Sequence, residues 1–267
     1  MTVKLVATDL DGTMLQDNKV TPKTKQIVQE MIKKGVELVI STGRMHCATQ
    51  MTVRQLGINP YIVSYNGAMV HQGLYGEELQ NITMDKDIAK KLIAIGMENG
   101  VVMHVYINDV LYVQEMTNWT ANYMKLCAAP TRLLEDLKEA IDIFGDPTKV
   151  LFISTPQNCA NMQKMLRQKF AGEIYITSSA PYFVEAINPN VHKGKGVKIV
   201  ADRLGIKQSE ILVIGDNYND MDLFEAGDIK IAMGDAVDAL KESATWVTDT
   251  VTNDGWYKAI RKFVFEE

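Results

Sequence analysis

Short apolar runs and longer amphipathic segments alternate along the first third of the chain. Apolar runs at 3–8, 36–40 and 61–64 are short enough to be buried strands. Between the first two runs, Thr21 followed by Pro22 is typical of a helix start, because threonine can cap the helix and proline fits its first turn. This order predicts strands that alternate with helices from the beginning of the chain.

The first predicted helix has one apolar face. The residues that mark it are Ile27, Val28, Met31 and Ile32. Gly35 is expected to end this helix, and a second helix is predicted over 45–56. Strands separated by helices in this way are typical of a doubly wound parallel sheet, a Rossmann-like α/β core.

The pattern changes after about residue 81. A short hairpin is expected to follow the third strand as far as residue 78, and then a helix followed by two strands occurs twice. These helices and strand pairs are 85–99 with 101–107 and 110–113, and 156–170 with 173–177 and 182–187. Between them lie two helical stretches, 119–126 and 133–144, and a strand at 149–154. We expect residues 82–188 to form a separate α+β domain.

The alternation of strands and helices then resumes. A helix is predicted over 194–204, and the remaining strands are predicted over 211–214, 229–232 and 246–248. The first and the last third of the chain therefore both have the pattern of strands and helices that is typical of a parallel sheet. We expect residues 1–81 and 189–267 to form the α/β core, with 82–188 inserted into it.

Composition excludes several classes of function. The 267 residues carry a net charge of −5, which provides no basic surface for nucleic acid or an anionic membrane. The apolar runs are too short to span a bilayer, and the N-terminus lacks the pattern of a signal peptide. The three cysteines lie far apart and predict neither a disulfide framework nor a zinc site. We expect a cytoplasmic protein, a monomer or homodimer, without a nucleic-acid or membrane partner.

Two carboxylates follow the first predicted strand. Asp9 and Asp11 are separated by one residue and precede Gly12. Because side chains alternate along an extended chain, both should leave on the same side, about 7 Å apart. One could hold a hard cation and attack an electrophile while the other moves a proton. The same residues could instead form only a turn after the strand, so the other strand ends must decide.

The ends of other predicted strands, and the start of one predicted helix, carry groups that could act together with these two carboxylates. Thr42 and Gly43 follow the second strand, Lys193 precedes a helix, and Asp216 follows the strand at 211–214. Carboxylates without a histidine or cysteine partner suit a divalent ion that prefers oxygen ligands, and Mg²⁺ is the ion we expect. A hydroxyl with backbone N–H groups and a lysine suits phosphate. Phosphoryl transfer needs little beyond positioning and charge neutralisation, so these residues predict that reaction.

Four segments, in this order, resemble the motifs of the haloacid-dehalogenase-like (HAD) hydrolases. They are Asp9-Leu10-Asp11-Gly12-Thr13, Ser41-Thr42-Gly43-Arg44, Lys193-Gly194-Lys195-Gly196 and Gly215-Asp216-Asn217-Tyr218-Asn219-Asp220. The inserted domain, with Ser64-Tyr65-Asn66-Gly67-Ala68 and Ala232-Met233-Gly234, resembles the Cof-type sugar phosphatases with their large α/β cap. The resemblance covers essentially the whole chain.

The resemblance implies a role for each matching residue. Asp9 would attack phosphorus, form an aspartyl-phosphate and ligate Mg²⁺. Asp11 would protonate the leaving oxygen and then take a proton from water, and its backbone carbonyl would be a metal ligand. Asp216 would complete the metal site, with Asn217 nearby. The residues implied to hold the phosphoryl group are Leu10, Thr42, Gly43, Lys193 and Asn219.

Three further residues are candidates for a supporting role. Asp220 is expected either to support the metal ligands or to orient Lys193. Arg44 could grip phosphate through two nitrogens or form a structural ion pair. Asn66, in the segment that resembles the Cof-type proteins, is the third candidate.

The resemblance implies a Mg²⁺-dependent phosphatase of small phosphorylated metabolites, sugar phosphates first. A phosphotransferase or phosphomutase is an alternative, because the same aspartyl-phosphate can be passed to a sugar hydroxyl. A non-catalytic regulator that senses phosphorylated metabolites is another, although sensing needs no general acid such as Asp11. Specificity is expected to lie in side chains of the inserted domain, and the sequence does not name the substrate.

Overall fold

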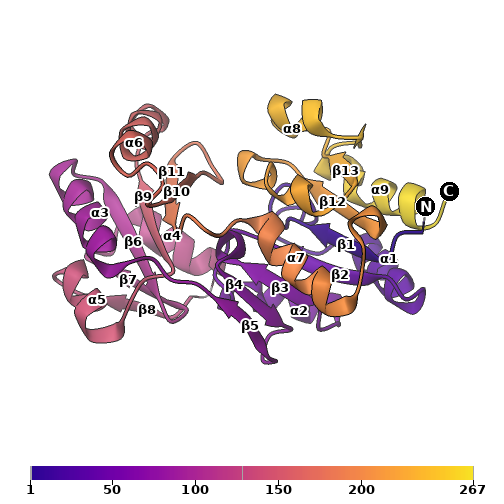
Figure 1. The fold of residues 1–267 in the computed structure, drawn as a ribbon, viewed down its shortest axis with the longest axis horizontal. Helices are drawn as coiled ribbons and strands as arrows, with labels where there is room; N and C mark the ends of the chain where they lie inside the picture. Colours follow the sequence, from indigo (N-terminus) through magenta and orange to yellow (C-terminus); the bar gives the residue numbers. More distant parts are fainter. Residues whose placement is uncertain (1, 128, 267) are drawn as a thin grey trace. The chain divides into compact units, whose positions relative to one another are not determined.

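Residues 2–127 and 129–266 are described in the computed structural model, and the side chains of residues 126 and 127 lie outside that description. The chain divides into two compact units, each with its own sheet and hydrophobic core (Figure 1). The first unit comprises Met1–Gln80 and His192–Glu267, and the second comprises Asn81–Val191. Both ends of the chain therefore belong to the same unit.

The first unit is built on an eight-stranded sheet with the order β14-β13-β12-β1-β2-β3-β4-β5. Its strands are β1 (Leu5–Thr8), β2 (Glu37–Ser41), β3 (Tyr61–Ser64), β4 (Met69–Gln72), β5 (Glu78–Asn81), β12 (Ile211–Gly215), β13 (Ile229–Ala232) and β14 (Trp246–Val247). Neighbouring strands from β14 to β3 are parallel, whereas β4 is antiparallel to β3. The structure confirms the predicted doubly wound parallel core and adds an antiparallel edge to it.

Helices cover both faces of this sheet. They are α1 (Pro22–Lys33), α2 (Gln50–Leu56), α7 (Lys193–Leu204), α8 (Asp238–Ser243) and α9 (Gly255–Val264). In Figure 1, α7 lies in front of the sheet against β2 and β3, and α1 lies behind it, against β2 and α9. The hydroxyl of Thr21 accepts a hydrogen bond from the N–H of Thr24 at 3.1 Å, which confirms the predicted cap of α1.

The structure corrects two local predictions in this unit and adds a helix that was not predicted. Ile32 is 38% exposed, because at about 100° per residue it lies at the edge of the face that Ile27 and Met31 share. The stretch 45–56 is not one helix, since a 3₁₀ turn at Cys47–Thr49 precedes α2. Helix α9, which no sequence pattern predicted, packs against α1.

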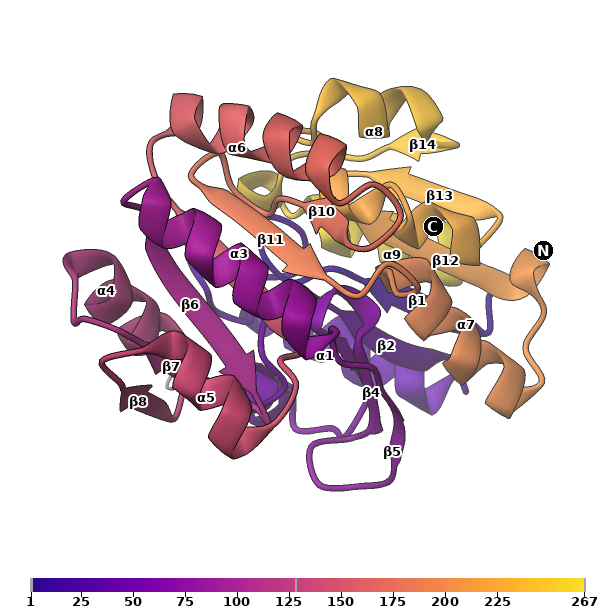
Figure 2. The same ribbon diagram turned by 60° about the vertical axis from the view of Figure 1, so that its left-hand side comes forward.

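The second unit is built on a six-stranded sheet with the order β10-β11-β9-β6-β7-β8. Its strands are β6 (Val102–Ile107), β7 (Val110–Val113), β8 (Thr131–Leu133), β9 (Lys149–Ile153), β10 (Tyr175–Thr177) and β11 (Phe183–Ile187). Its helices are α3 (Lys86–Glu98), α4 (Asn118–Cys127), α5 (Leu137–Phe144) and α6 (Pro156–Lys169). Neighbouring strands are antiparallel except β7 and β8. Figure 2 shows α3 and α6 lying across this sheet. The core of this unit includes Val105 and Phe152.

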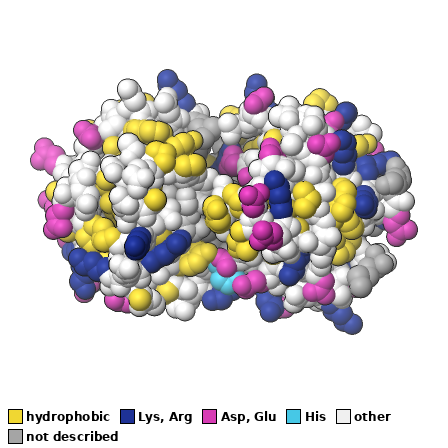
Figure 3. Space-filling view, turned by 90° about the horizontal axis from the view of Figure 1, so that it is seen from above, with side chains coloured by type: hydrophobic (Ala, Val, Ile, Leu, Met, Phe, Trp, Pro, Cys, Tyr) yellow, Lys and Arg dark blue, Asp and Glu magenta, His cyan; other side chains and the backbone are white. Residues whose placement is uncertain are grey.

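Acidic and basic side chains are interspersed on the face shown in Figure 3. Among the described helices, none combines the length and the apolar character needed to cross a membrane. Cys47 is half-buried, Cys159 is a buried free thiol, and the side chain of Cys127 lies outside the described part of the chain.

Candidate active site

The carboxyl ends of three neighbouring strands meet at one edge of the first unit's sheet. Thr8, the last residue of β1, pairs with Ile40 of β2 and Ile214 of β12, so these strands end at the same level. Asp9 follows β1 directly and is only 5% exposed. Its backbone N–H donates to the carbonyl of Ile214 at 3.0 Å. Open α/β sheets bind their ligands at this edge.

A lysine at the start of α7 lies against Asp9. The Nζ of Lys193 is 2.9 Å from Oδ1 of Asp9 and 2.7 Å from Oδ1 of Asp220, and Lys193 is fully buried. The second oxygen of Asp220 accepts hydrogen bonds from the backbone N–H groups of Asp216 and Asn217, at 2.9 and 3.1 Å. Asp220 therefore ties Lys193 to the loop that follows β12.

Asp9, Asp216 and Asp220 form an acidic cluster. One carboxylate oxygen of each lies within 4.8 Å of the other two. Thr13 donates its hydroxyl to Oδ1 of Asp216 at 2.7 Å. Gly12, with φ of 76°, leaves room for the same carboxylate, since a Cβ at Gly12 would lie 2.5 Å from its Oδ2. Carboxylate oxygens at this spacing fit a hard divalent cation.

Burial changes the proton affinity of these groups. It raises the pKa of Asp9 well above its ordinary value, against the opposing effect of Lys193. Burial, and then the neighbouring Asp220, raises the pKa of Asp216 to about 7. Burial favours the neutral amine of Lys193, but Asp220 and Asp9 outweigh it and raise the pKa of the ammonium above its ordinary value. The lysine stays charged, and a bound cation would favour the ionised acids.

Asp11 faces Arg44. The Nε of Arg44 donates to Oδ2 of Asp11 at 2.7 Å, and a terminal nitrogen of the same guanidinium donates to Oδ1. That terminal nitrogen also donates to Oδ1 of Asn18 at 2.9 Å. The side chain of Asp11 is 49% exposed, in contrast to the buried Asp9. Arg44 was expected either to bind phosphate or to form an ion pair. The structure contains an ion pair, and the partner of Arg44 in it is Asp11, the candidate acid.

The loops after β2 and β12 meet the segment after β3 at a pair of carboxamides. The Nδ2 of Asn219 donates to Oδ1 of Asn66 at 3.2 Å, and both side chains are buried. Gly43 lies beside this pair, since a Cβ there would lie 3.0 Å from Oδ1 of Asn66. Thr42 is 1% exposed, and its hydroxyl accepts from the N–H of Arg44 at 3.2 Å. The structure thus brings three of the predicted phosphate-binding residues to the same edge.

Leu10 and Asn217 shape the loops that carry the acids. The side chain of Leu10 is fully buried, and its carbonyl accepts hydrogen bonds from the N–H groups of Met14 and Leu15 at 3.1 and 2.9 Å. The Oδ1 of Asn217 accepts from the N–H of Tyr218 at 2.8 Å. Both contacts hold turns that follow the strands.

Thr13 and Trp256 contact the site although the sequence predicted no role for either. Thr13 stands in the segment that contains both aspartates, so its position was visible even though its bond to Asp216 was not. The Nε1 of Trp256 donates to the hydroxyl of Thr8 at 2.9 Å, and this hydroxyl donates to the carbonyl of Asp9 at 2.8 Å. No local pattern links Trp256 to a residue 248 positions away.

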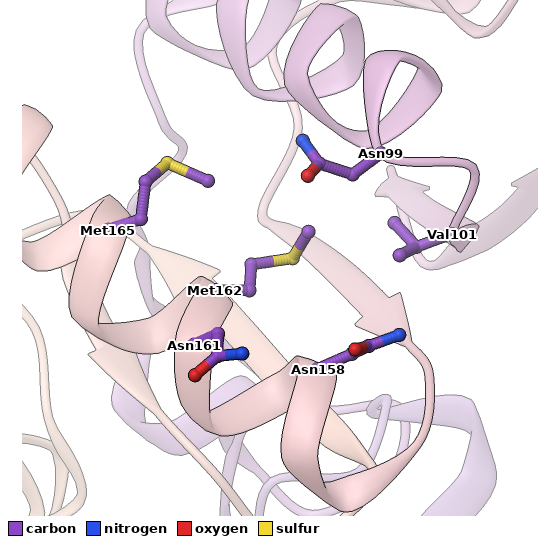
Figure 4. A pocket seen from close by; sticks show the side chains of 6 residues that line it. All are labelled: Asn99, Val101, Asn158, Asn161, Met162 and Met165. Carbon is purple, nitrogen blue, oxygen red and sulfur yellow. The ribbon is translucent and has the colours of Figure 1, made fainter.

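A separate cavity lies within the second unit, between the C-terminal end of α3 and α6 (Figure 4). Its volume is about 360 Å³. The side chains that line it are those of Asn99, Val101, Asn158, Asn161, Met162 and Met165. None of these side chains is charged or nucleophilic, so the cavity lacks the groups that phosphate chemistry requires. The edge that carries Asp9 is the candidate active site.

Comparison with known proteins places this chain in a family. Residues 6–260 match the family model of the haloacid dehalogenase-like hydrolases. The 5-amino-6-(5-phospho-D-ribitylamino)uracil phosphatase YitU of Bacillus subtilis is 29% identical over 270 residues, which cover 97% of each chain. The crystal structure of TM0651 from Thermotoga maritima is 28% identical, with a TM-score of 0.83 over 98% of this chain and 97% of that one.

The HAD subclass IIB sugar phosphatase BT4131 is 21% identical and shares the fold, with a TM-score of 0.83 over 98% of this chain and 99% of that one. The family model spans nearly the whole chain, including all four motif segments. The resemblance seen in those segments is confirmed, and the chain belongs to the haloacid dehalogenase-like hydrolases.

Proposed function

We propose that this protein is a Mg²⁺-dependent phosphatase of small phosphorylated metabolites, sugar phosphates first. One observation carries the proposal: the buried carboxylate of Asp9 lies 2.9 Å from the fully buried ammonium of Lys193. A carboxylate in this position can attack phosphorus beside a cation that holds the phosphoryl oxygens. The names of YitU and BT4131, a phosphatase of a phosphoribityl compound and a sugar phosphatase, support this substrate class.

In the first step, an oxygen of Asp9 attacks phosphorus and the bond from phosphorus to the ester oxygen breaks. Asp11 donates its proton to the departing oxygen, which leaves as an alcohol. An aspartyl-phosphate remains on Asp9. The groups assigned to hold the phosphoryl oxygens are the backbone N–H of Leu10, the hydroxyl of Thr42, the N–H of Gly43, the ammonium of Lys193 and the carboxamide of Asn219.

In the second step, water attacks the phosphorus of the aspartyl-phosphate. Asp11, now a carboxylate, takes the proton from this water, and the bond between phosphorus and Asp9 breaks. Orthophosphate is released, and both aspartates return to their initial states. Asp11 acts as an acid in the first step and as a base in the second, so it must lose and regain a proton once in each turnover.

Asp9, the backbone carbonyl of Asp11 and Asp216, with Asn217 nearby, are the residues assigned to hold Mg²⁺. When bound, the ion supplies positive charge that offsets the charges of the phosphoryl group and of the carboxylates. The carboxylate oxygens of Asp9 and Asp216, which lie within 4.8 Å of each other, and the raised pKa of Asp216, caused first by burial, support a cation at this position.

Two residues are assigned to orient the reacting groups. Asp220 orients Lys193 instead of ligating the metal, because both of its oxygens already accept hydrogen bonds. Arg44 orients Asp11 through two hydrogen bonds to its carboxylate. Both assignments follow from contacts that are present without a substrate.

The second unit is assigned to substrate selection. Its sheet carries none of the four motif segments, and the cavity between α3 and α6 has no charged lining. The phosphoryl chemistry is therefore assigned to Met1–Gln80 and His192–Glu267, and the recognition of the rest of the substrate to Asn81–Val191.

The test is orthophosphate release from a panel of sugar phosphates and polyol phosphates in the presence of Mg²⁺. We expect activity in the unaltered protein and a loss of about 10³-fold or more in Asp9→Asn, because an amide does not attack phosphorus. Asp17→Asn removes an exposed carboxylate from the loop between β1 and α1 and should retain full activity. After acid quenching, phosphate should be found on the peptide that contains Asp9.

Two outcomes would contradict the proposal. Orthophosphate release that survives Asp9→Asn would exclude the aspartyl-phosphate. A phosphorylated sugar as the main product, in place of orthophosphate, would make the protein a phosphotransferase.

A further inference from the structure

The three residues that follow β3 form a left-handed turn. Tyr65, Asn66 and Gly67 have φ angles of 52°, 53° and 102°. Asparagine tolerates this conformation and glycine adopts it freely, but it is unfavourable for tyrosine. Such a backbone persists only where surrounding contacts hold it, and it is concentrated at functional sites. The contacts of this turn therefore need an explanation.

The backbone of the turn holds the loop that follows β2. The N–H of Tyr65 donates to the carbonyl of Arg44 at 2.9 Å, and the N–H of Asn66 donates to the carbonyl of Thr42 at 3.0 Å. In a planar trans peptide, the C=O and the following N–H point in opposite directions. The carbonyl of Thr42 points to Asn66, so the N–H of Gly43 points away from the turn. The turn thus sets the direction of an N–H that is assigned to hold phosphate.

The side chain of Asn66 holds a second group of the site. Its Oδ1 accepts one N–H of the Asn219 carboxamide at 3.2 Å. A carboxamide nitrogen carries two hydrogens, so the second N–H of Asn219 can serve a phosphoryl oxygen. Asn219 is 4% exposed, and its Oδ1 has no partner among the described residues. The bond to Asn66 therefore decides which way this carboxamide faces.

Gly67 gives the turn a third contact. A Cβ at this position would lie 2.2 Å from the carbonyl oxygen of His192, the residue before Lys193. Only glycine permits this approach, because any other side chain would collide with the backbone. One turn therefore touches the loop of Gly43, the start of α7 and the carboxamide of Asn219.

We infer that Asn66 is a positioning residue, which directs the Asn219 carboxamide and the Gly43 N–H toward the transferring phosphoryl group. The inference rests on the proposed function, which assigns both groups to that ligand. Asn66 acts through these two residues and has no assigned contact with the reacting atoms.

The first test is Asn66→Gly, which removes the carboxamide and keeps the turn, because glycine takes positive φ readily. We expect the inhibition constant of orthophosphate to rise, and kcat/KM for a sugar phosphate to fall, by about 10- to 100-fold. The melting temperature should stay close to that of the unaltered protein. Asp17→Gly is the matched control, since Asp17 has φ of 50°, is exposed in the first unit and should leave both constants unchanged.

The decisive test measures the effect of Asn219→Ala in three backgrounds. In the unaltered protein this substitution should weaken orthophosphate inhibition. In the Asn66→Gly protein it should add less than about twofold, because Asn219 has already lost its orientation. In the Asn66→Asp protein, where the turn and the acceptor oxygen remain, Asn219→Ala should have its full effect again. A merely structural role of Asn66 would not produce this pattern.

Equal effects of Asn219→Ala in the unaltered and Asn66→Gly proteins would overturn the inference. If Asn66→Gly does not fold, Asn66→Asp still decides, because loss of the Asn219→Ala effect there would also overturn it. Thermal stabilisation by orthophosphate supplies a readout that needs no turnover. If the protein hydrolyses no phosphate ester but this stabilisation follows the same pattern, the proposed function fails and the positioning role stands.

Discussion

The ammonium nitrogen of Lys193 lies 2.7 Å from Oδ1 of Asp220, and neither side chain has exposed surface. A buried ion pair adds little net stability while both partners are present, but removal of one partner leaves an unpaired buried charge. Asp220 also accepts hydrogen bonds from two backbone N–H groups of the loop that carries Asp216. The pair therefore connects the lysine assigned to phosphate with the loop assigned to the metal.

We expect Asp220→Asn to lower the free energy of unfolding by about 3 kcal/mol and kcat/KM by at least about tenfold. An amide cannot satisfy both neighbours, because its NH₂ must face either the ammonium of Lys193 or the two backbone N–H groups. Denaturant unfolding and orthophosphate release measure the two effects. Asp228→Asn removes an exposed carboxylate of the same unit and should change neither. Equal stability of the two variants would show that Asp9 alone holds Lys193.

Asp11→Asn should act according to the basicity of the leaving group. An alkyl phosphate needs a proton on its departing oxygen and should lose about 10²- to 10⁴-fold in kcat, whereas an aryl phosphate should lose far less. Arg44→Gln leaves the carboxylate of Asp11 without its orienting partner and should show the same dependence in weaker form. The comparison uses one alkyl and one aryl ester at saturating Mg²⁺. Equal losses on both esters would exclude an acid role for Asp11.

The residues at strand ends were predictable because their chemistry is local. Asp9 and Asp11 follow an apolar run, Thr42 follows another, and parallel strands bring such ends to one edge. The pairing of Asn66 with Asn219 joins residues 153 positions apart. No periodicity encodes such a contact, because it depends on how the loops after β3 and β12 close in three dimensions.

A helix cap and a short strand explain why the start of one helix was predicted wrongly. The helix predicted over 133–144 begins at Leu137, because the side chain of Asp136 caps it by accepting from the N–H of Lys138 at 2.8 Å. The residues before this cap belong in part to β8, whose three residues are too few to show an alternating pattern. The sequence leaves the role of Asp220 open for a different reason. Whether a carboxylate orients a lysine or ligates a metal depends on interatomic distances, which the sequence does not contain.

Asp216 should make the stability of the metal-free protein depend on pH. Burial, and then Asp220, raises its pKa from 3.8 to about 7 in the folded protein. Between these values the folded state keeps a proton that the unfolded chain has lost, so this group's contribution to stability falls as the pH rises. Asparagine does not titrate. In chelator, the melting temperature of Asp216→Asn relative to the unaltered protein should therefore rise between about pH 4 and about pH 7.

Mg²⁺ at pH 7 should make the unaltered protein more stable than Asp216→Asn, because only the ionised carboxylate binds the metal. The unaltered protein should gain stability from Mg²⁺, and Asp216→Asn should gain much less. A difference in melting temperature that stays constant with pH in chelator would contradict the raised pKa of Asp216.

Ca²⁺ should bind the metal site and inhibit the enzyme. The assigned ligands are all oxygen atoms, but Mg²⁺ requires six near-ideal ligands at about 2.1 Å, whereas Ca²⁺ accepts six to eight at about 2.3–2.6 Å. The looser arrangement can take both oxygens of Asp9 and turn the attacking oxygen away from phosphorus, where a displacement of about 1 Å can cost a factor of about 100. We expect rising Ca²⁺ at fixed Mg²⁺ to suppress orthophosphate release, excess Mg²⁺ to restore it, and Mn²⁺ to support it. Full activity with Ca²⁺ as the only divalent ion, or undiminished activity in chelator, would exclude the metal site assigned to Asp9, Asp11 and Asp216.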